Sequence, residues 1–328
     1  MDTDVTNLDN LIQPTNAKPT VSWTNIILYI ILAFGISWSI WIGLRAVGVA
    51  FTLRTSIGMF GPALAALLVR LIRREGFADA GLGLIGSGRR RAGWMYLAAY
   101  LAPPLLIAAS IVAVMLAGVQ HWAFSDNLHT SSKAITDAFT KQGQKLPVGD
   151  NADQLALLSI IAGSLFAFTL AISINMLFTF GEEFGWRGYL LPRLAPLGGV
   201  PAAMITGIIW GLWHTPVIVL DGYNYLGHPY LGVAMTVLFT VALGMILAWL
   251  RFRSGSIWPP VLAHAAFNAQ AGFPVVFLSR GDALLGAPIG LVGLLPMIAF
   301  ALWLAFTGRL RAQPDNVPIV DNAPEPAV

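Results

Sequence analysis

The chain contains 328 residues, of which 56% are hydrophobic and 11% charged, with a formal net charge of +3 at pH 7. Ordinary soluble domains carry about 25% charged residues, so this composition excludes a soluble domain and predicts a polytopic membrane protein. The absence of cysteine excludes thiol nucleophiles, disulfides and metal sites built on cysteine. Membrane topology accounts for the basic residues, so no nucleic-acid partner is expected.

Apolar runs of about 17–25 residues, the length needed to cross a bilayer, recur along the chain. Such runs are expected at 25–44, 56–72, 93–118, 155–181, 201–220, 230–250, 257–277 and 288–307. Gly and Pro interrupt the last two runs. The predicted fold is therefore all-α, a polytopic membrane helical bundle of about eight transmembrane helices.

One membrane domain is expected over residues 23–310, and the motifs described below place its core at about 155–275. Residues 1–22 are polar and lack the basic start of a cleavable signal, which predicts a retained, disordered cytoplasmic N-terminus. Prolines and acidic residues in 311–328 predict a disordered C-terminal tail. The 119–154 loop is expected to hold a short amphipathic helix near 132–140, with His121 and His129 as solvated residues.

The positions of arginine and lysine predict which ends of the spans face the cytoplasm. With residue 1 inside, thirteen of the nineteen basic residues fall in inside segments and six in outside segments. Three of those six lie in the 119–154 loop, whose length weakens their influence. The positive-inside rule therefore predicts an integral protein of a bacterial cytoplasmic membrane, with both termini in the cytoplasm.

Two adjacent carboxylates, Glu182 and Glu183, directly follow the fourth apolar run. A charged side chain at membrane depth costs about 2.5–3.5 kcal/mol, so a pair of them needs a physical reason. Glu183 and Arg187 are four residues apart and can form an ion pair on one helix face. Glu182 points to a different side of the helix, which leaves its carboxylate free to face a cavity.

The segment from Pro196 to Pro201 is a dense turn signal, so the fourth and fifth spans should form an antiparallel hairpin. Counted from this turn, Glu182 and His214 lie at nearly the same level on facing helices. The prolines at 259 and 260 predict the first turn of a later helix. His264 and Asn268 then share one face of that helix, in the same half of the bilayer as Glu182.

Each of these features also has a purely structural interpretation. The Glu183–Arg187 pair can be a packing ion pair, and a lone membrane histidine such as His214 or His264 can bond a neighbouring helix. Asn268 alone is typical of contacts between helices. Trp210 and Trp213 are most simply packing or interfacial aromatics. Their conjunction within late, successive spans favours a catalytic site that acts on a substrate held in the membrane.

The three motifs read EEFGWR at 182–187, WGLWH at 210–214 and HAAFN at 264–268. They resemble the EExxxR, FxxxH and HxxxN signatures of the CAAX-protease and bacteriocin-processing family of intramembrane proteases, also called the abortive-infection family. The resemblance extends over most of the chain from Phe60 to about residue 270. One departure is clear: Trp210 replaces the usual phenylalanine, and we expect this to change the shape of the pocket and leave its chemistry unchanged.

The resemblance implies an intramembrane endopeptidase domain over 23–310 that cleaves membrane-anchored peptides or proteins. In this family's terms Glu182 is the general base that activates water, and His214 positions that water. His264 and Asn268 stabilise the oxyanion, while Glu183 and Arg187 hold the site together. Removal of one oxyanion donor costs about 2.7–4 kcal/mol in other enzymes, so these roles are testable.

The family is commonly labelled metalloprotease, and Glu182, His214 and His264 would form a His₂Glu set of the kind that binds zinc. The two histidines lie on separate helices and lack the HExxH spacing of zinc proteases, so metal-independent catalysis is favoured and zinc stays possible. Two other classes of function remain open. A proton-coupled transporter also uses buried Glu and His, and a bacteriocin-immunity protein would bind a partner without catalysis.

Overall fold

The structure is a computed structural model that describes residues 20–84, 93–146 and 151–311. Within these residues the regular elements are helices, and the one β-contact is an isolated antiparallel bridge between Trp122 and Leu278. The all-α prediction is therefore confirmed. The predicted disorder of the two ends concerns residues 1–19 and 312–328 almost entirely, and these lie outside the described residues.

The helices follow one another closely along the chain. They are α1 (Trp23–Ala46), α2 (Phe51–Gly58), α3 (Gly61–Arg73), α4 (Trp94–Leu116), α5 (Phe124–Lys141), α6 (Ala152–Phe168), α7 (Leu170–Gly185), α8 (Leu191–Leu194), α9 (Gly199–Trp213), α10 (Thr215–Asp221), α11 (Pro229–Ser254), α12 (Trp258–Gln270), α13 (Phe273–Phe277) and α14 (Leu295–Phe306). Between α7 and α8 the helix widens into a π-turn, Trp186–Leu190.

Five helical segments among the described residues are long and apolar enough to cross a membrane, and the bent pair formed by α6 with the stretch 170–197 makes up to six. The seventh and eighth predicted spans are shorter than expected. The former divides into α12, of 13 residues, and α13, of 5 residues, and the latter contains α14, of 12 residues. Gly272 and Pro274 interrupt the first of these, so the count of eight stays a prediction.

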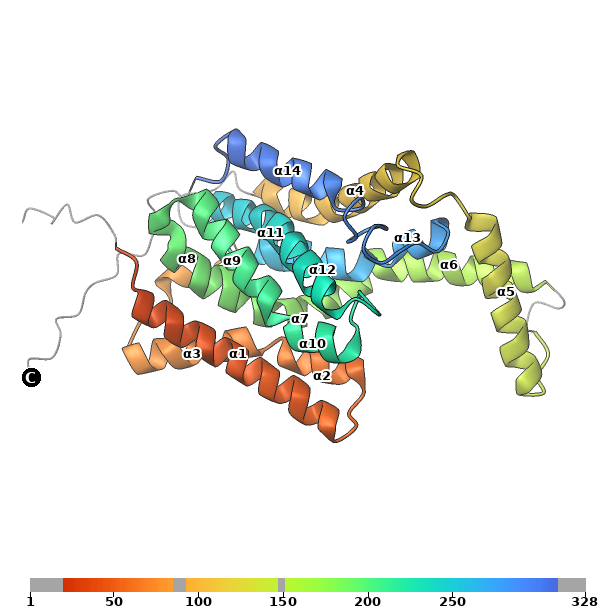
Figure 1. The fold of residues 1–328 in the computed structure, drawn as a ribbon, viewed down its shortest axis with the longest axis horizontal. Helices are drawn as coiled ribbons and strands as arrows, with labels where there is room; N and C mark the ends of the chain where they lie inside the picture. The colour runs from red at the N-terminus through yellow and green to blue at the C-terminus, as the bar shows by residue number, and fades with distance from the viewer. Residues whose placement is uncertain (1–19, 85–92, 147–150, 312–328) are drawn as a thin grey trace, which may run out of the picture.

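Figure 1 shows how the helices are arranged. The start of α1, the end of α3, the short helix α8 and the ends of α11 and α14 gather at the left of the view. Helices α13 and α5 lie towards the opposite end of the view, and α10 lies at its lower middle. Large apolar side chains face outward on many of these helices, as expected of a surface in contact with lipid; examples are Ile31, Leu71, Leu105, Leu177 and Phe306.

Glycines let α7 lie directly against the second predicted span. A Cβ atom at Gly181 would lie 2.8 Å from the Met59 carbonyl oxygen, and one at Gly185 would lie 2.4 Å from the Pro62 Cβ. The spacing of four residues is the small-xxx-small pattern of close membrane helix pairs. This close approach beside Gly61-Pro62 fixes the height of the adjacent Glu182 and Glu183.

Helices α9 and α11 are also brought close together by glycines. A Cβ at Gly207 would lie 2.7 Å from the Val241 Cα, and one at Gly211 would lie 2.6 Å from the Val237 Cα. The Thr240 hydroxyl donates to the Gly207 carbonyl at 2.9 Å, which adds an interhelical hydrogen bond. This contact holds the face of α9 that carries Trp210 at a fixed depth.

The loop predicted over 119–154 is more ordered than expected. Helix α5 runs over 124–141, twice the length of the predicted helix near 132–140. Its own carbonyls accept side-chain hydrogen bonds from Thr130, Ser131, Thr136 and Thr140, which suits an interfacial helix. His121 and His129 are exposed, as predicted.

Candidate active site

An enclosed ion pair lies at the end of α7. Arg187 Nη1 donates to Glu183 Oε1 at 2.8 Å, and both side chains are 0% exposed. The spacing of four residues on a helix predicts this contact. Because an isolated charge inside a membrane protein is costly, the pair is what allows either group to be buried here.

His264 on α12 joins the same carboxylate. Its Nδ1 lies 2.9 Å from Glu183 Oε1, the oxygen that also accepts the Arg187 bond. A carboxylate oxygen accepts, so His264 Nδ1 carries the proton and Nε2 is the nitrogen left for other contacts. Glu183 therefore ties α7 to α12 as well as balancing Arg187.

Glu182 is 2% exposed and takes a different partner. The indole Nε1 of Trp210, on α9, donates to Glu182 Oε2 at 2.7 Å. The two adjacent carboxylates thus have different partners. Glu183 accepts from Arg187 and His264, whereas Glu182 accepts from the neutral indole N–H of Trp210. Glu182 is an ionisable group inside the helical bundle, with one oxygen fixed and the other, Oε1, left for a further ligand.

His214, just after the last residue of α9, is held by its own helix. Its Nδ1 lies 2.9 Å from the Trp210 carbonyl oxygen, so Nδ1 donates there and Nε2 is again the available nitrogen. The residue of the facing helix that donates to Glu182 is Trp210, one turn before His214, and the common level of Glu182 and His214 stays a prediction. The π-turn at 186–190 lies between Glu182 and the hairpin, and its wider turn brings Glu182 slightly nearer to the hairpin than a regular α-helix would.

Asn268 lies on α12 one turn beyond His264, as predicted, and is exposed. Among the described residues it makes no hydrogen bond to another side chain or carbonyl. The structure therefore brings together Glu182, Glu183, Arg187 and His264, with His214 joined to them through Trp210, and leaves Asn268 at their edge.

Trp210 is the site residue that its sequence position did not reveal. Its ring lies under the Arg187 guanidinium, with 4.5 Å between Cζ and the ring centroid, and 5.1 Å from the centroid of the His264 ring. Trp210 does more than fill space, because its indole N–H reaches a carboxylate, while the expectation that the chemistry is unchanged stays a prediction. Trp213 packs as predicted: its ring contacts Trp41 and Trp186, and its edge-to-face contact with the His214 ring at 4.8 Å is one that a phenylalanine ring can also make.

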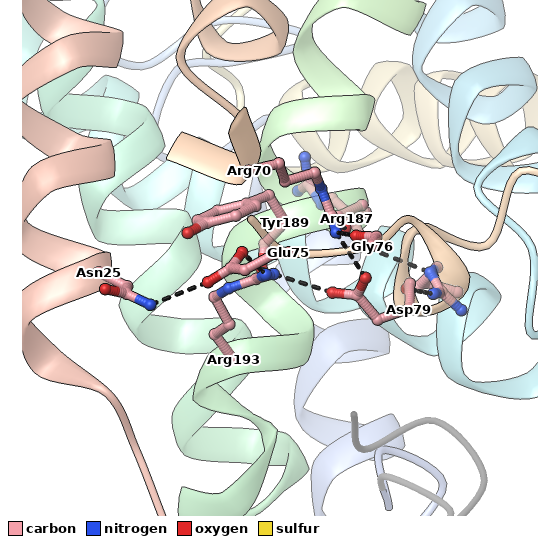
Figure 2. A network of polar contacts seen from close by, with 10 residues as sticks. Asn25, Arg70, Glu75, Gly76, Asp79, Arg187, Tyr189 and Arg193 are labelled. Carbon is pink, nitrogen blue, oxygen red and sulfur yellow. Dashed lines mark hydrogen bonds and ion pairs between the residues drawn. The ribbon is translucent and has the colours of Figure 1, made fainter. Parts of the chain in front are cut away.

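The π-turn that carries Arg187 is held by two further arginines (Figure 2). A π-turn displaces backbone carbonyls from the ordinary helical bonding pattern. Arg70 Nη2 donates to the Gly188 carbonyl at 3.0 Å, and Arg251 Nε donates to the Arg187 carbonyl at 3.2 Å. These bonds from α3 and α11 supply donors at membrane depth, where no bulk water is present.

Figure 2 also shows the acidic residues that surround Arg70 and a neighbouring arginine, Arg193. Asp79 accepts from Arg70 Nη1 at 2.7 Å and from Arg193 Nη1 at 2.9 Å. Glu75 pairs with Arg193 and accepts from Asn25 Nδ2 at 2.8 Å. The network joins α1, α3, the 74–80 segment and α8 at one end of the bundle.

Glu182, His214 and His264 are the side chains that would be expected to bind a metal ion. Across the residues that the structure describes, no three side chains of the His, Cys, Asp and Glu types are arranged to hold a metal ion. Glu182 Oε2 already accepts the Trp210 bond, and the two imidazoles are turned by different partners, Glu183 and the Trp210 carbonyl. Glu182, His214 and His264 as arranged do not fit a zinc site, and whether the protein uses a metal stays a prediction.

Comparison with known proteins places these residues within a matched region. Residues 163–270 match the family described as type II CAAX prenyl endopeptidase Rce1-like. A human protein, "CAAX prenyl protease 2", is 32% identical over 99 residues, which are 29% of this chain and 30% of that protein. The chain thus aligns with less than a third of this curated relative. The resemblance that the three signatures indicate is therefore confirmed over residues 163–270, where the chain is similar to the Rce1-like type II CAAX prenyl endopeptidase family.

Proposed function

We propose that the protein is an intramembrane endopeptidase that hydrolyses a peptide bond in a membrane-anchored peptide or protein. The single observation that carries the proposal is the pair of adjacent carboxylates with separate partners, Glu183 neutralised by Arg187 and Glu182 held by a neutral N–H. Two neighbouring carboxylates such as Glu182 and Glu183 do not easily carry a negative charge at the same time, and the positive charge of Arg187 compensates one of them. Glu182 is then available as a base inside a site that excludes bulk water.

In the proposed reaction Glu182 Oε1 accepts a proton from water as the water oxygen attacks the scissile carbonyl carbon. The electron pair of the carbonyl bond moves onto its oxygen and forms the oxyanion. Glu182 then returns the proton to the amide nitrogen as the carbon–nitrogen bond breaks. General acid–base steps of this kind contribute about 10²–10⁴-fold, and they need the base within hydrogen-bond reach of the water.

His214 and His264 take different parts because of the protons that they carry. The Nδ1 proton of His214 is committed to a carbonyl, so its neutral Nε2 accepts a hydrogen bond and can hold the water. The Nδ1 proton of His264 is committed to Glu183, so its Nε2 donates to an oxyanion only when the ring carries both protons. A charged His264 with Arg187 would balance Glu182 and Glu183. Asn268 supplies a neutral donor beside it.

The substrate class follows from the location of the site and from the similarity. The bundle holds its ionisable groups among apolar helices, which favours a substrate that is itself anchored in the bilayer. The human relative carries the name of a CAAX prenyl protease, and we extend to this chain the cleavage of a lipid-anchored C-terminal segment. A bacteriocin-type or other unprenylated substrate is the alternative that the experiment separates.

The test uses the purified full-length protein in liposomes with two reporters. One is a farnesylated peptide ending in a CaaX sequence, and the other is a matched peptide anchored by an apolar helix. Wild type should cleave at least one reporter, and Glu182→Gln should cleave neither while remaining folded and inserted. Asp137→Asn, which changes an exposed carboxylate paired with Lys133, is the matched control and should retain full activity.

Cleavage by the Glu182→Gln variant at the wild-type rate would overturn the assignment of the base. Absence of cleavage by wild type, together with proton-coupled uptake of a solute that Glu182→Gln abolishes, would favour a transporter. Binding of a bacteriocin or another partner that is unaffected by Glu182→Gln would favour an immunity protein. Each outcome therefore selects one class of function.

A further inference from the structure

We infer that Trp210 is a positioning residue for the base: its indole N–H tethers one oxygen of Glu182 and leaves the other turned toward the substrate. The inference rests on the proposed endopeptidase function and adds to it a residue that the family signature does not supply, because phenylalanine has no N–H. The Trp210 Nε1 to Glu182 Oε2 distance of 2.7 Å is that of a charge-assisted hydrogen bond.

The tether acts on a group that has few other constraints. Within the part of the chain that the structure describes, Glu182 forms no ion pair with Arg187, whose Nη1 donates to Glu183. A glutamate side chain has several rotamers, and loss of its fixed orientation would move the base away from the water. The hydrogen bond selects one rotamer and assigns Oε2 to Trp210, so that Oε1 is the oxygen available for proton transfer.

Trp210 itself is held rigidly enough to act as an anchor. The side chain is 1% exposed, the Arg187 guanidinium covers its ring at 4.5 Å, and the His264 ring meets it edge to face at 5.1 Å. Its backbone lies between Gly207 and Gly211, the two positions at which α9 presses against α11. The indole therefore cannot rotate without displacing other site residues.

A purely structural role for Trp210 predicts a different result from the tether, and Trp213 offers the comparison. Trp213 lies three residues on, on the same helix, and is 0% exposed. Its indole N–H is enclosed and has no acceptor among the described residues. Replacement of either tryptophan by phenylalanine removes one N–H and keeps an aromatic ring, but only the change at Trp210 releases a carboxylate.

The experiment compares Trp210→Phe, Trp213→Phe and Glu182→Gln in the liposome assay. We expect Trp210→Phe to lower kcat about ten- to a hundredfold, as loss of a hydrogen bond to a charged group does, with KM within about twofold. Trp213→Phe should keep kcat within about twofold. A merely structural role would lower kcat similarly in both phenylalanine variants, or would raise KM and reduce the melting temperature together.

A second measurement does not depend on finding a substrate. Melting temperatures of Trp210→Phe, Glu182→Ala and the double variant form a double-mutant cycle. A tether predicts that the effect of the double variant is smaller than the sum of the single effects by at least about 2 °C. Additive effects would overturn the inference even where no reporter is cleaved.

The possible outcomes distinguish failure of the Trp210 inference from failure of the proposed endopeptidase function. Full activity of Glu182→Gln removes the proposed function. Loss of activity in Glu182→Gln together with a wild-type kcat in Trp210→Phe would contradict the positioning role of Trp210 and leave the proposed function standing. Loss of kcat in Trp210→Phe, with Trp213→Phe unaffected and a non-additive melting cycle, supports both.

Discussion

Glu183, the carboxylate that neutralises Arg187, also holds His264: the His264 Nδ1 lies 2.9 Å from the Glu183 oxygen that accepts the arginine bond. The buried Oε1 atom of Glu183 thus orients both Arg187, in the π-turn that follows α7, and His264, on α12. Glu183 Oε2 is enclosed and has no partner among the described residues, so the carboxylate depends on these two contacts. The residue is therefore structural in a specific sense, because it sets the tautomer and direction of a site histidine.

Replacement of Glu183 by Gln should destabilise the protein more than replacement of Glu182. The amide leaves Arg187 without a counter-charge at a position that is 0% exposed, and loss of one partner of a buried pair costs about 3–5 kcal/mol. Melting in detergent should show a clear decrease for Glu183→Gln and little change for Glu182→Gln. Equal melting temperatures for the two variants would contradict the structural role assigned to Glu183.

Replacement of Gly185 by Ala should destabilise the contact between α7 and α3. The added Cβ would lie 2.4 Å from the Pro62 Cβ, and overpacking of this kind costs about 1–3 kcal/mol. Gly163→Ala on α6 is the matched control, because a Cβ there meets nothing within 4 Å. Thermal unfolding should separate the two alanine variants, and a lower melting temperature for Gly163→Ala than for Gly185→Ala would count against the packing argument.

Topology provides an independent check on the side at which the site lies. The arginine bias predicts both termini in the cytoplasm, and Figure 1 places the start of α1 and the end of α14 at the same end of the bundle. Reporter fusions at residue 328 and within 125–150 should therefore report opposite sides of the membrane. A cytoplasmic signal from the 125–150 fusion would reverse the expected orientation and the cytoplasmic access of Glu182.

Metal dependence can be measured directly. We expect purified protein to hold well below one equivalent of zinc and to remain active after treatment with a chelator. The reason is geometric: zinc needs its histidine nitrogens at about 2.0–2.1 Å from one point, and the described residues offer no such gathering of three ligands. Stoichiometric zinc with activity that is lost on chelation and restored by metal would make His214 and His264 ligands and withdraw the oxyanion role of His264.

Much of this arrangement could be predicted from spacing. The Glu183–Arg187 contact follows from four-residue helical geometry, and the hairpin follows from the turn signal at 196–201. The histidine bonds could not be predicted in the same way. The π-turn at 186–190 lies in the interval between Glu182 and the hairpin, and no residue pattern predicts it. The bond between Trp210 and Glu182 is likewise not predictable from the spacing.

The role of Trp210 was missed for a related reason. Replacement of one aromatic residue by another preserves size and ring character, which is what a sequence pattern records. The difference that matters is a single N–H group, and it has an effect only where a carboxylate lies within reach. The length of α5 was also underestimated, because serine and threonine favour loops in sequence although here they bond within the helix.

The arginine bonds to the π-turn set a limit on what the matched region can do alone. Residues 163–270 include the whole π-turn and all six candidate site residues, yet Arg70, which donates to the Gly188 carbonyl, and Asp79, which holds Arg70, both lie outside it. We therefore expect that residues 163–270 do not keep the π-turn in this geometry on their own. A fragment cut to these bounds would keep Arg251 and its bond to the Arg187 carbonyl, but it would lose Arg70 and leave the Gly188 carbonyl without that donor. Helices that precede residue 163 thus help to shape the candidate site from outside the matched region.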